Sequence, residues 1–322
     1  MLEQHKGSAH ILVAQDLLAL SWVLRTLGEF ESTLSSAQRS LEIMEQILGA
    51  DHPALAISLG VMGRALWNLN RIAEARACAE RAITTLDKSQ ASLHPLICGT
   101  WLNLAQIQLD SGDLGRADRC AQLGIGIGER AYGLDHPLVS ASVCVRGMVM
   151  ERSGDLEGAR RCYERALASG QRVCRHLHED IAIAQSGLGN VLRLLGDRDG
   201  ARSNLEHALA GASRLCGDTA RFEGHVRVAL SALYRELGDL AAAQTQCETG
   251  LGVLAARYGA RHPVCLGGLN ALGGIFRELG DAKRARESFQ AAIEIAEAAA
   301  LLDQPDHAAS LEGLQGLSAE GR

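Results

Sequence analysis

Three arginines at a constant interval are the side chains of this sequence that best combine type and spacing for ligand binding. The interval from Arg193 to Arg235 equals that from Arg235 to Arg277, and each arginine stands three residues before a glycine. A planar guanidinium group binds a carboxylate through two parallel hydrogen bonds. If the fold brings the three positions into register, they form a ladder that captures an acidic or C-terminal peptide.

Two other patterns resemble reactive sites, but each has a structural interpretation that we favour. The segment GIGIGER, at 124–130, resembles a glycine-rich phosphate loop, yet no strand is readable before it and it falls inside an expected helix. His176 and His178, followed by Glu179 and Asp180, have the chemistry of metal ligands but lie in a loop where histidine belongs to a repeated pattern. No nucleophile, base and orienting residue can be assembled from the sequence. We therefore expect no catalysis, no cofactor and no metal.

Composition narrows the class of protein further. The chain has 322 residues, of which 47% are apolar and only 3% aromatic, and this balance suits closely packed helices. A net charge of −6 gives no basic footprint for nucleic acid. No secretion signal and no apolar stretch of membrane-spanning length is readable, and the nine cysteines show no metal or disulfide spacing. These features predict a reduced, cytoplasmic protein that binds neither membrane nor nucleic acid.

The elements that must position the arginines follow from a sequence repeat with the same period as the ladder. A turn position recurs seven times, occupied by glycine or once by asparagine, the residues that best end a helix in the left-handed conformation. Columns of small residues stand seven before and twelve after this turn, and a column of Leu or Ile follows the second of them. The seven turn residues are Gly28, Asn70, Gly112, Gly154, Gly196, Gly238 and Gly280.

Each unit is predicted to contain two antiparallel helices. The first, helix A, ends at the turn residue, and the second, helix B, has an aspartate in its first turn in five units. A second glycine ends helix B in several units, and a His-Pro pair, as at His52 and Pro53, starts the next helix A, where proline loses no hydrogen bond. We interpret this pair as structural punctuation. The second glycines are Gly49, Gly133, Gly217 and Gly259.

This unit resembles the tetratricopeptide repeat, and its 42-residue period with an LG-x-DHP segment is similar to the longer variant of kinesin light chains and many bacterial repeat proteins. The resemblance implies an all-α fold, a right-handed α-solenoid of about seven helix-turn-helix repeats in one array over 1–322. Thr33 in place of the usual alanine and Asn70 in place of the turn glycine depart from the family pattern. The expected repeats are 11–52, 53–94, 95–136, 137–178, 179–220, 221–262 and 263–304, with a capping helix at 305–322.

The resemblance also implies a concave groove lined mainly by helix A. Counting back from each turn places amide and arginine side chains there, and amides bind a peptide backbone. The predicted peptide-binding residues are Arg64, Asn103, Gln106, Asn190, Arg193, Arg235, Asn270 and Arg277. Two alternatives stay open, because the dipole favours basic residues in the last turn of a helix without any ligand, and because Glu236 and Glu278 stand next to two of the positions. Trp22 and Trp67 are candidates for an apolar anchor or for packing between repeats.

The favoured function is a non-enzymatic scaffold that binds a peptide or a partner protein, and the arginines are compatible with an acidic one. The alternative is the sensor or regulatory repeat portion of a larger bacterial signalling NTPase. It rests on the segment 3–10, which repeats the phase of 45–52 as if the chain started inside a helix B. No nucleotide-binding motif is present, so the switch itself would lie outside this chain.

Overall fold

All seven predicted turns adopt the backbone conformation that the spacing requires. The turn residues have φ angles between 61° and 89°, which is the left-handed region. Asn70, with φ of 61°, is the one non-glycine residue of the described ranges with a positive φ. Asparagine tolerates this conformation better than most residues because its short polar side chain bonds locally. The prediction of helix pairs joined at these turns is therefore confirmed.

The computed structural model describes residues 10–88, 97–173, 179–212, 220–299, 301–302 and 305–320. Within these ranges the chain contains fifteen α-helices, one short 3-10 helix and no strand, so the all-α fold class is confirmed. The chain divides into two units, Met1–Ser153 and Gly154–Arg322, each of which has its own packed interior. The boundary falls inside the fourth expected repeat, and a single continuous array over 1–322 stays a prediction.

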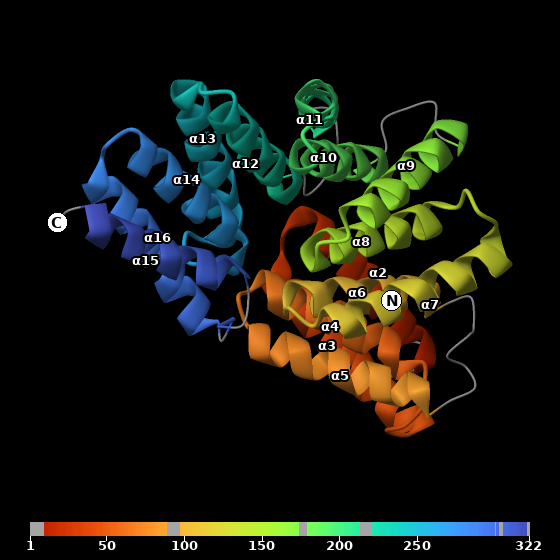
Figure 1. Cartoon of the computed structure of the whole chain (residues 1–322). Coiled ribbons are helices and arrows are strands. Elements are labelled where there is room, and N and C mark those ends of the chain that lie inside the picture. Colours follow the sequence, from red (N-terminus) through yellow and green to blue (C-terminus); the bar gives the residue numbers. More distant parts are fainter. Residues whose placement is uncertain are drawn as a thin grey trace. The chain divides into compact units, whose positions relative to one another are not determined.

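The first unit alternates four A helices with three B helices (Figure 1). The first three A helices each pack against the B helix that follows them, and successive A helices pack on one another. The A helices are α2 (Ile11–Leu27), α4 (Leu55–Asn68), α6 (Cys98–Asp110) and α8 (Pro137–Ser153). The B helices are α3 (Phe30–Leu48), α5 (Ile72–Asp87) and α7 (Leu114–Tyr132).

The second unit follows the same rule but begins with a B helix. Its B helices are α9 (Leu156–Val173), α11 (Arg198–Ala212), α13 (Leu240–Tyr258) and α15 (Ala282–Ala298). Its A helices are α10 (Glu179–Leu194), α12 (Ala220–Glu236), α14 (Leu266–Glu278), which follows the 3-10 helix η3 (Pro263–Cys265), and α16 (Pro305–Glu320). These four A helices pack on one another in chain order.

Aspartates start five of the B helices. In each case the carboxylate accepts a hydrogen bond of 2.8–3.0 Å from the backbone N–H three residues further on. This geometry is that of an N-cap, so the aspartate stands just before the helix rather than inside its first turn. The five capping residues are Asp113, Asp155, Asp197, Asp239 and Asp281.

Loop histidines cap the start of the A helices in the same way. The Nδ1 atoms of His52, His136 and His262 each accept a backbone N–H two residues further on, at 3.1–3.2 Å. The ring of His136 also stacks on Tyr132 at the end of the preceding B helix, with 4.5 Å between ring centroids. Structural punctuation is thus confirmed for these three loops, whereas His94, His178 and Gly217 lie outside the described residues.

Small residues allow the close approach of helices that the repeat pattern predicts. A Cβ atom added at Gly63 or Gly189 would lie 2.7 Å from a side-chain carbon of Ile107 or Leu205 respectively. Real Cβ atoms do not come so close, so a larger residue at either site would force its neighbour to shift. Several of the described cysteines are also buried in the interior, and burial raises the pKa of the Cys120 thiol to about 12.

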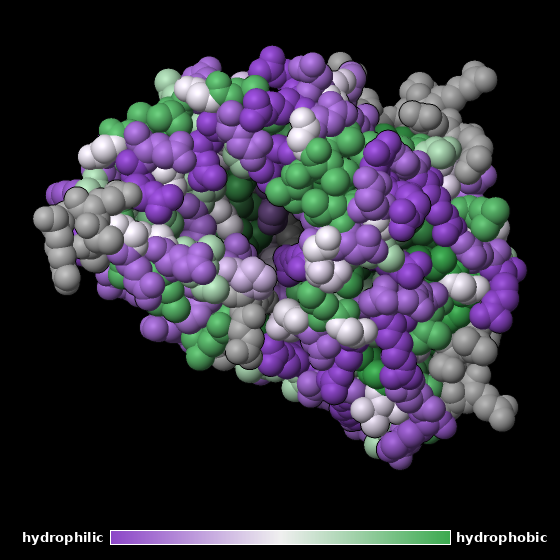
Figure 2. Space-filling view, viewed as in Figure 1, coloured by the Kyte–Doolittle hydropathy of each residue, from purple (hydrophilic) through white to green (hydrophobic). Residues whose placement is uncertain are grey.

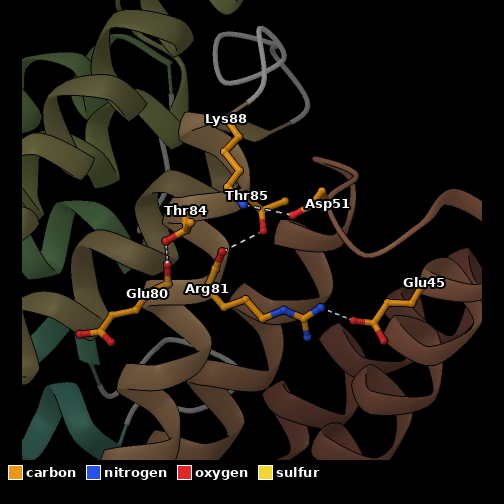
Figure 3. Close-up of polar contacts among 7 residues, drawn as sticks. All are labelled: Glu45, Asp51, Glu80, Arg81, Thr84, Thr85 and Lys88. Carbon is orange, nitrogen blue, oxygen red and sulfur yellow. Dashed lines mark hydrogen bonds and ion pairs between the residues drawn. The ribbon is translucent and has the colours of Figure 1, made fainter.

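Charged side chains join successive B helices on their exposed sides. Figure 3 shows Arg81 of α5 paired with Glu45 of α3, and Lys88 just after α5 paired with Asp51 beyond α3, at 3.3 Å. Exposed pairs of this kind contribute little to stability, about 0–1 kcal/mol each. Hydrophilic residues cover much of the face seen in Figure 2, with apolar residues in several separate areas of different size.

Candidate functional site

The arginine ladder occupies equivalent places on three A helices of the second unit. Arg193, Arg235 and Arg277 lie in the last turns of α10, α12 and α14. Because these helices pack on one another in order, the three side chains follow one another from repeat to repeat. The sequence spacing therefore places them as predicted, at the carboxyl end of each A helix.

The first two arginines of the ladder form ion pairs that cross from one repeat to the next. Arg193 pairs with Glu236 of α12, and Arg235 Nε lies 3.6 Å from Glu278 Oε1 of α14. Each acid stands 43 residues after its arginine, rather than beside it in the same repeat. Arg193 also donates to Asn190 Oδ1 from Nε at 3.2 Å and from Nη2 at 2.9 Å. Two predicted ligand-binding arginines are thus neutralised within the protein. This agrees with the alternative in which Glu236 and Glu278 pair with arginines of the ladder.

Arg277 continues the ladder and is exposed to solvent. A Cβ atom added at Gly316 of α16 would lie 3.2 Å from Arg277 Nη1, so this guanidinium rests on the small residue of the next A helix. Arg235 lies over Gly274 in the same manner, with 2.6 Å to an added Cβ. Glycine at these places gives the planar groups room, and Arg277 is the arginine of the ladder that solvent reaches most freely.

Asn270 already uses both ends of its amide. Its Nδ2 donates to the backbone oxygen of Asp306 at 2.7 Å, and its Oδ1 accepts the hydroxyl of Ser310 at 2.6 Å. These bonds tie α14 to the start of α16. A peptide bound at this amide would have to replace these hydrogen bonds. The sequence did not reveal that Asn270 links two helices in this way.

In the first unit, Arg64 is buried beneath the surface that it was expected to line. Its Nη1 atom lies 3.3 Å from Asp110 Oδ2, with both side chains about nine-tenths buried, and its guanidinium stands 5.2 Å from the ring centroid of Trp67. Asn103 and Gln106 of α6 are half-buried. The amides of these two residues are therefore better placed than Arg64 to meet a ligand.

The two tryptophans have different environments. Trp67 is buried, so the packing interpretation is confirmed for it. Trp22 of α2 is exposed, with the guanidinium of Arg25 at 5.3 Å from its ring centroid, so the packing interpretation is wrong there. A cation above an aromatic face holds the ring in place while leaving part of it open.

The other segments that resembled reactive sites in the sequence have structural roles where the structure describes them. The segment 124–130 lies within α7. An added Cβ would lie 3.0 Å from Ser142 of α8 at Gly124 and 2.6 Å from Val139 at Gly128, so these two glycines serve helix packing. His176 and His178 lie outside the described residues. Among the residues that the structure describes, no cluster of three or more His, Cys, Asp or Glu side chains is arranged to hold a metal ion. No helix in the same ranges is long and apolar enough to cross a membrane.

The class of protein is now defined by its repeats. The tetratricopeptide repeat family matches at residues 17–88, 96–172, 180–256 and 225–298. The chain therefore belongs to the tetratricopeptide repeat family, and its long repeat unit is visible in both the turn positions and the helix boundaries. No curated protein matches the chain significantly in sequence.

Solved structures of low sequence identity share the fold. The apo form of RapI is 12% identical, with 88% of this chain and 98% of RapI covered and a TM-score of 0.63. A Rap protein complexed with Competence and Sporulation Factor is 13% identical, with 97% and 99% covered and a TM-score of 0.58. BtubC (BKLC) from P. vanneervenii is 20% identical, with 71% and 92% covered and a TM-score of 0.52.

Proposed function

We propose that this protein is a non-enzymatic interaction scaffold that binds a peptide or a partner protein through the exposed sides of its A helices. The observation that carries the proposal is the register of Arg193, Arg235 and Arg277 on consecutive stacked helices, with Arg277 open to solvent. Membership of the tetratricopeptide repeat family supports a binding role. A Rap protein of the same fold is complexed with Competence and Sporulation Factor, which adds support by analogy.

The ladder favours an acidic ligand. Its carboxylates would replace the protein's own glutamates as the ion-pair partners of the arginines. A carboxylate meets Arg277 first, since this guanidinium is the exposed one. Further carboxylates then take the places of Glu278 and Glu236 on Arg235 and Arg193, and the displaced acids turn to solvent. Because the helices are already packed, the receptor loses little conformational entropy on binding. In the first unit, Asn103 and Gln106 are the residues proposed to bind a peptide backbone.

A phage-displayed library of random peptides with free C-termini tests this proposal on the full chain. We expect the wild type to enrich acidic C-terminal sequences. The variant R193A/R235A/R277A should bind a selected peptide at least about tenfold more weakly, because one charge-assisted hydrogen bond contributes about 1.5–3 kcal/mol. The salt dependence of binding should flatten in the same variant.

The matched control removes three arginines of the B helices and loops. R116A/R119A/R261A changes net charge equally but leaves the ladder intact, so it should retain the affinity of the wild type. Equal losses in both variants would mean that net charge alone attracts the peptide. A selected peptide that binds the ladder variant and the wild type equally would refute the site, and a library without any enriched acidic sequence would refute the ligand class.

A further inference from the structure

Histidines cap the starts of A helices through the same ring nitrogen in both units. The Nδ1 atom of His10 accepts the backbone N–H two residues further on at 3.1 Å, as the Nδ1 atoms of His52, His136 and His262 do in their own loops. A nitrogen that accepts an N–H uses its lone pair, so the proton of each neutral ring lies on Nε2. These four residues, the cap histidines, therefore depend on a neutral imidazole.

A proton gained by a cap histidine binds Nδ1 and removes the acceptor. The new positive charge is also unfavourable at the start of a helix, where the dipole already places partial positive charge. Histidine is the side chain whose charge ordinarily changes between pH 5 and 8. Because the rings bind protons freely in the unfolded chain, the unfolded state binds more protons, and the stability that the caps contribute is lost as the pH falls.

Charged groups around the cap histidines do not act in one direction. Asp51 and Asp135 directly precede two of the rings and favour a proton there, whereas Arg261 precedes His262 and opposes one. The five residues after His10 carry no charge. The titratable groups beside the other three loops are Asp51, Lys88, Tyr132, Asp135, Tyr258, Arg261, Cys265 and Glu294. The lost hydrogen bond, by contrast, acts in the same direction at all four caps.

The B helices have caps that respond to a lower pH. Their five capping aspartates accept N–H groups through carboxylates, and aspartate ordinarily titrates near pH 3.9, about two and a half units below histidine. The backbone N–H and side chain of Arg284 lower the pKa of Asp281 below its ordinary 3.8. Mild acid therefore leaves the carboxylate caps ionised and intact.

We propose that the cap histidines make the A helices selectively sensitive to protons. As the pH falls from about 7 to 5, the first turns of α2, α4 and α8 and the 3-10 turn η3 before α14 loosen, while the B helices keep their caps. The response begins in the loops that lead into the A helices, whereas the arginines of the ladder lie at the opposite ends of their helices. It is separate from the ladder and goes beyond the function proposed above.

Amide hydrogen exchange of the full chain at pH 7 and pH 5, corrected for intrinsic exchange rates, tests the proposal without any ligand. In the wild type, the histidine-bonded amides should lose protection at least about fivefold at pH 5, which is the effect of losing one cap. The aspartate-bonded amides should keep their protection. The histidine-bonded amides are those of Leu12, Ala54, Leu138 and Val264. The aspartate-bonded amides are those of Arg116, Gly158, Gly200, Ala242 and Arg284.

Asparagine supplies a matched control, because its side-chain oxygen also caps a helix but gains no proton in this range. The variant H10N/H52N/H136N/H262N should show the same protection at both pH values. H207N, which replaces an exposed histidine within α11, should respond to pH as the wild type does.

Three results would overturn the proposal. The first is unchanged protection of the histidine-bonded amides at pH 5. The second is an equal loss at the aspartate-bonded amides, which would indicate general destabilisation by acid. The third is a pH response that persists in the asparagine variant, which would assign it to other groups. If that variant does not fold, the comparison of the two sets of amides in the wild type decides by itself.

Discussion

Replacement of Gly187 by alanine tests the packing of the second unit at a close contact between two of its helices. The added Cβ would lie 2.3 Å from Cζ and 2.4 Å from Cε1 of the Tyr163 ring. This ring is fully buried between α9 and α10 and cannot swing into solvent. Ordinary contact would need a shift of about 1 Å, and overfilling of a packed interior costs about 1–3 kcal/mol.

A second effect opposes this cost. Alanine is more favourable than glycine inside a helix by about 1 kcal/mol. Because the buried ring has no room to yield, the cost lies in the upper part of its range, and the net loss from Gly187→Ala should be about 1–2 kcal/mol. Gly252→Ala isolates the favourable term, because Gly252 lies in α13 of the same unit with nothing within 4 Å of an added Cβ. We therefore expect the two substitutions to change stability in opposite directions.

Urea denaturation followed by far-ultraviolet circular dichroism measures both effects. The midpoint should fall for Gly187→Ala and rise for Gly252→Ala, relative to the wild type. Repeat arrays often unfold in stages, so the comparison uses the transition that both variants shift. If Gly187→Ala stabilised the protein as much as Gly252→Ala does, the close packing of Tyr163 on this glycine would be refuted.

Two further substitutions probe polar groups of the repeat. Gln108 is 1% exposed, and its Nε2 has no hydrogen-bond partner among the described residues. The equivalent residues of the other repeats are apolar, so Gln108→Leu should stabilise the protein by about 1–3 kcal/mol. Thermal denaturation measures this, and a lower melting temperature would contradict it. The backbone N–H and side chain of Arg284 lower the pKa of Asp281 below its ordinary 3.8, so its carboxylate stabilises the fold above that pH and the contribution disappears as pH falls through the lowered pKa. Asp281→Ala should therefore lower the urea midpoint at pH 7 and have a smaller effect near pH 2, and a loss of equal size at both pH values would argue against the cap.

Backbone features of this fold were predictable because their causes are local. A turn at Asn70 follows from the identity of that residue and from glycine at the six equivalent positions. The same holds for the aspartate caps and for the histidines that start the A helices. In each case the residue and the group that it contacts are at most three positions apart, so one copy of the repeat contains the whole interaction.

Side-chain environments were less predictable because they depend on neighbours from other repeats. Arg64 stands at a groove position by spacing, yet Asp110 lies 46 residues away and draws it into the interior. Val23 is apolar like its counterparts, yet it is 56% exposed whereas Ile107 and Leu233 are fully buried. One long-range signal was readable: glutamate follows arginine by 43 residues at Glu236, Glu278 and Glu320. The first two instances are the pairs Arg193–Glu236 and Arg235–Glu278.

Most repeat units contain their own start and stop signals, and this has an evolutionary consequence. The turn residue, the aspartate after it and the loop histidine all act on backbone groups of the same unit or of its immediate junction. Unequal recombination between two equivalent positions adds or removes one unit and joins residues that already suit one another. The number of repeats in such a chain can therefore change in single genetic steps without a new kind of turn.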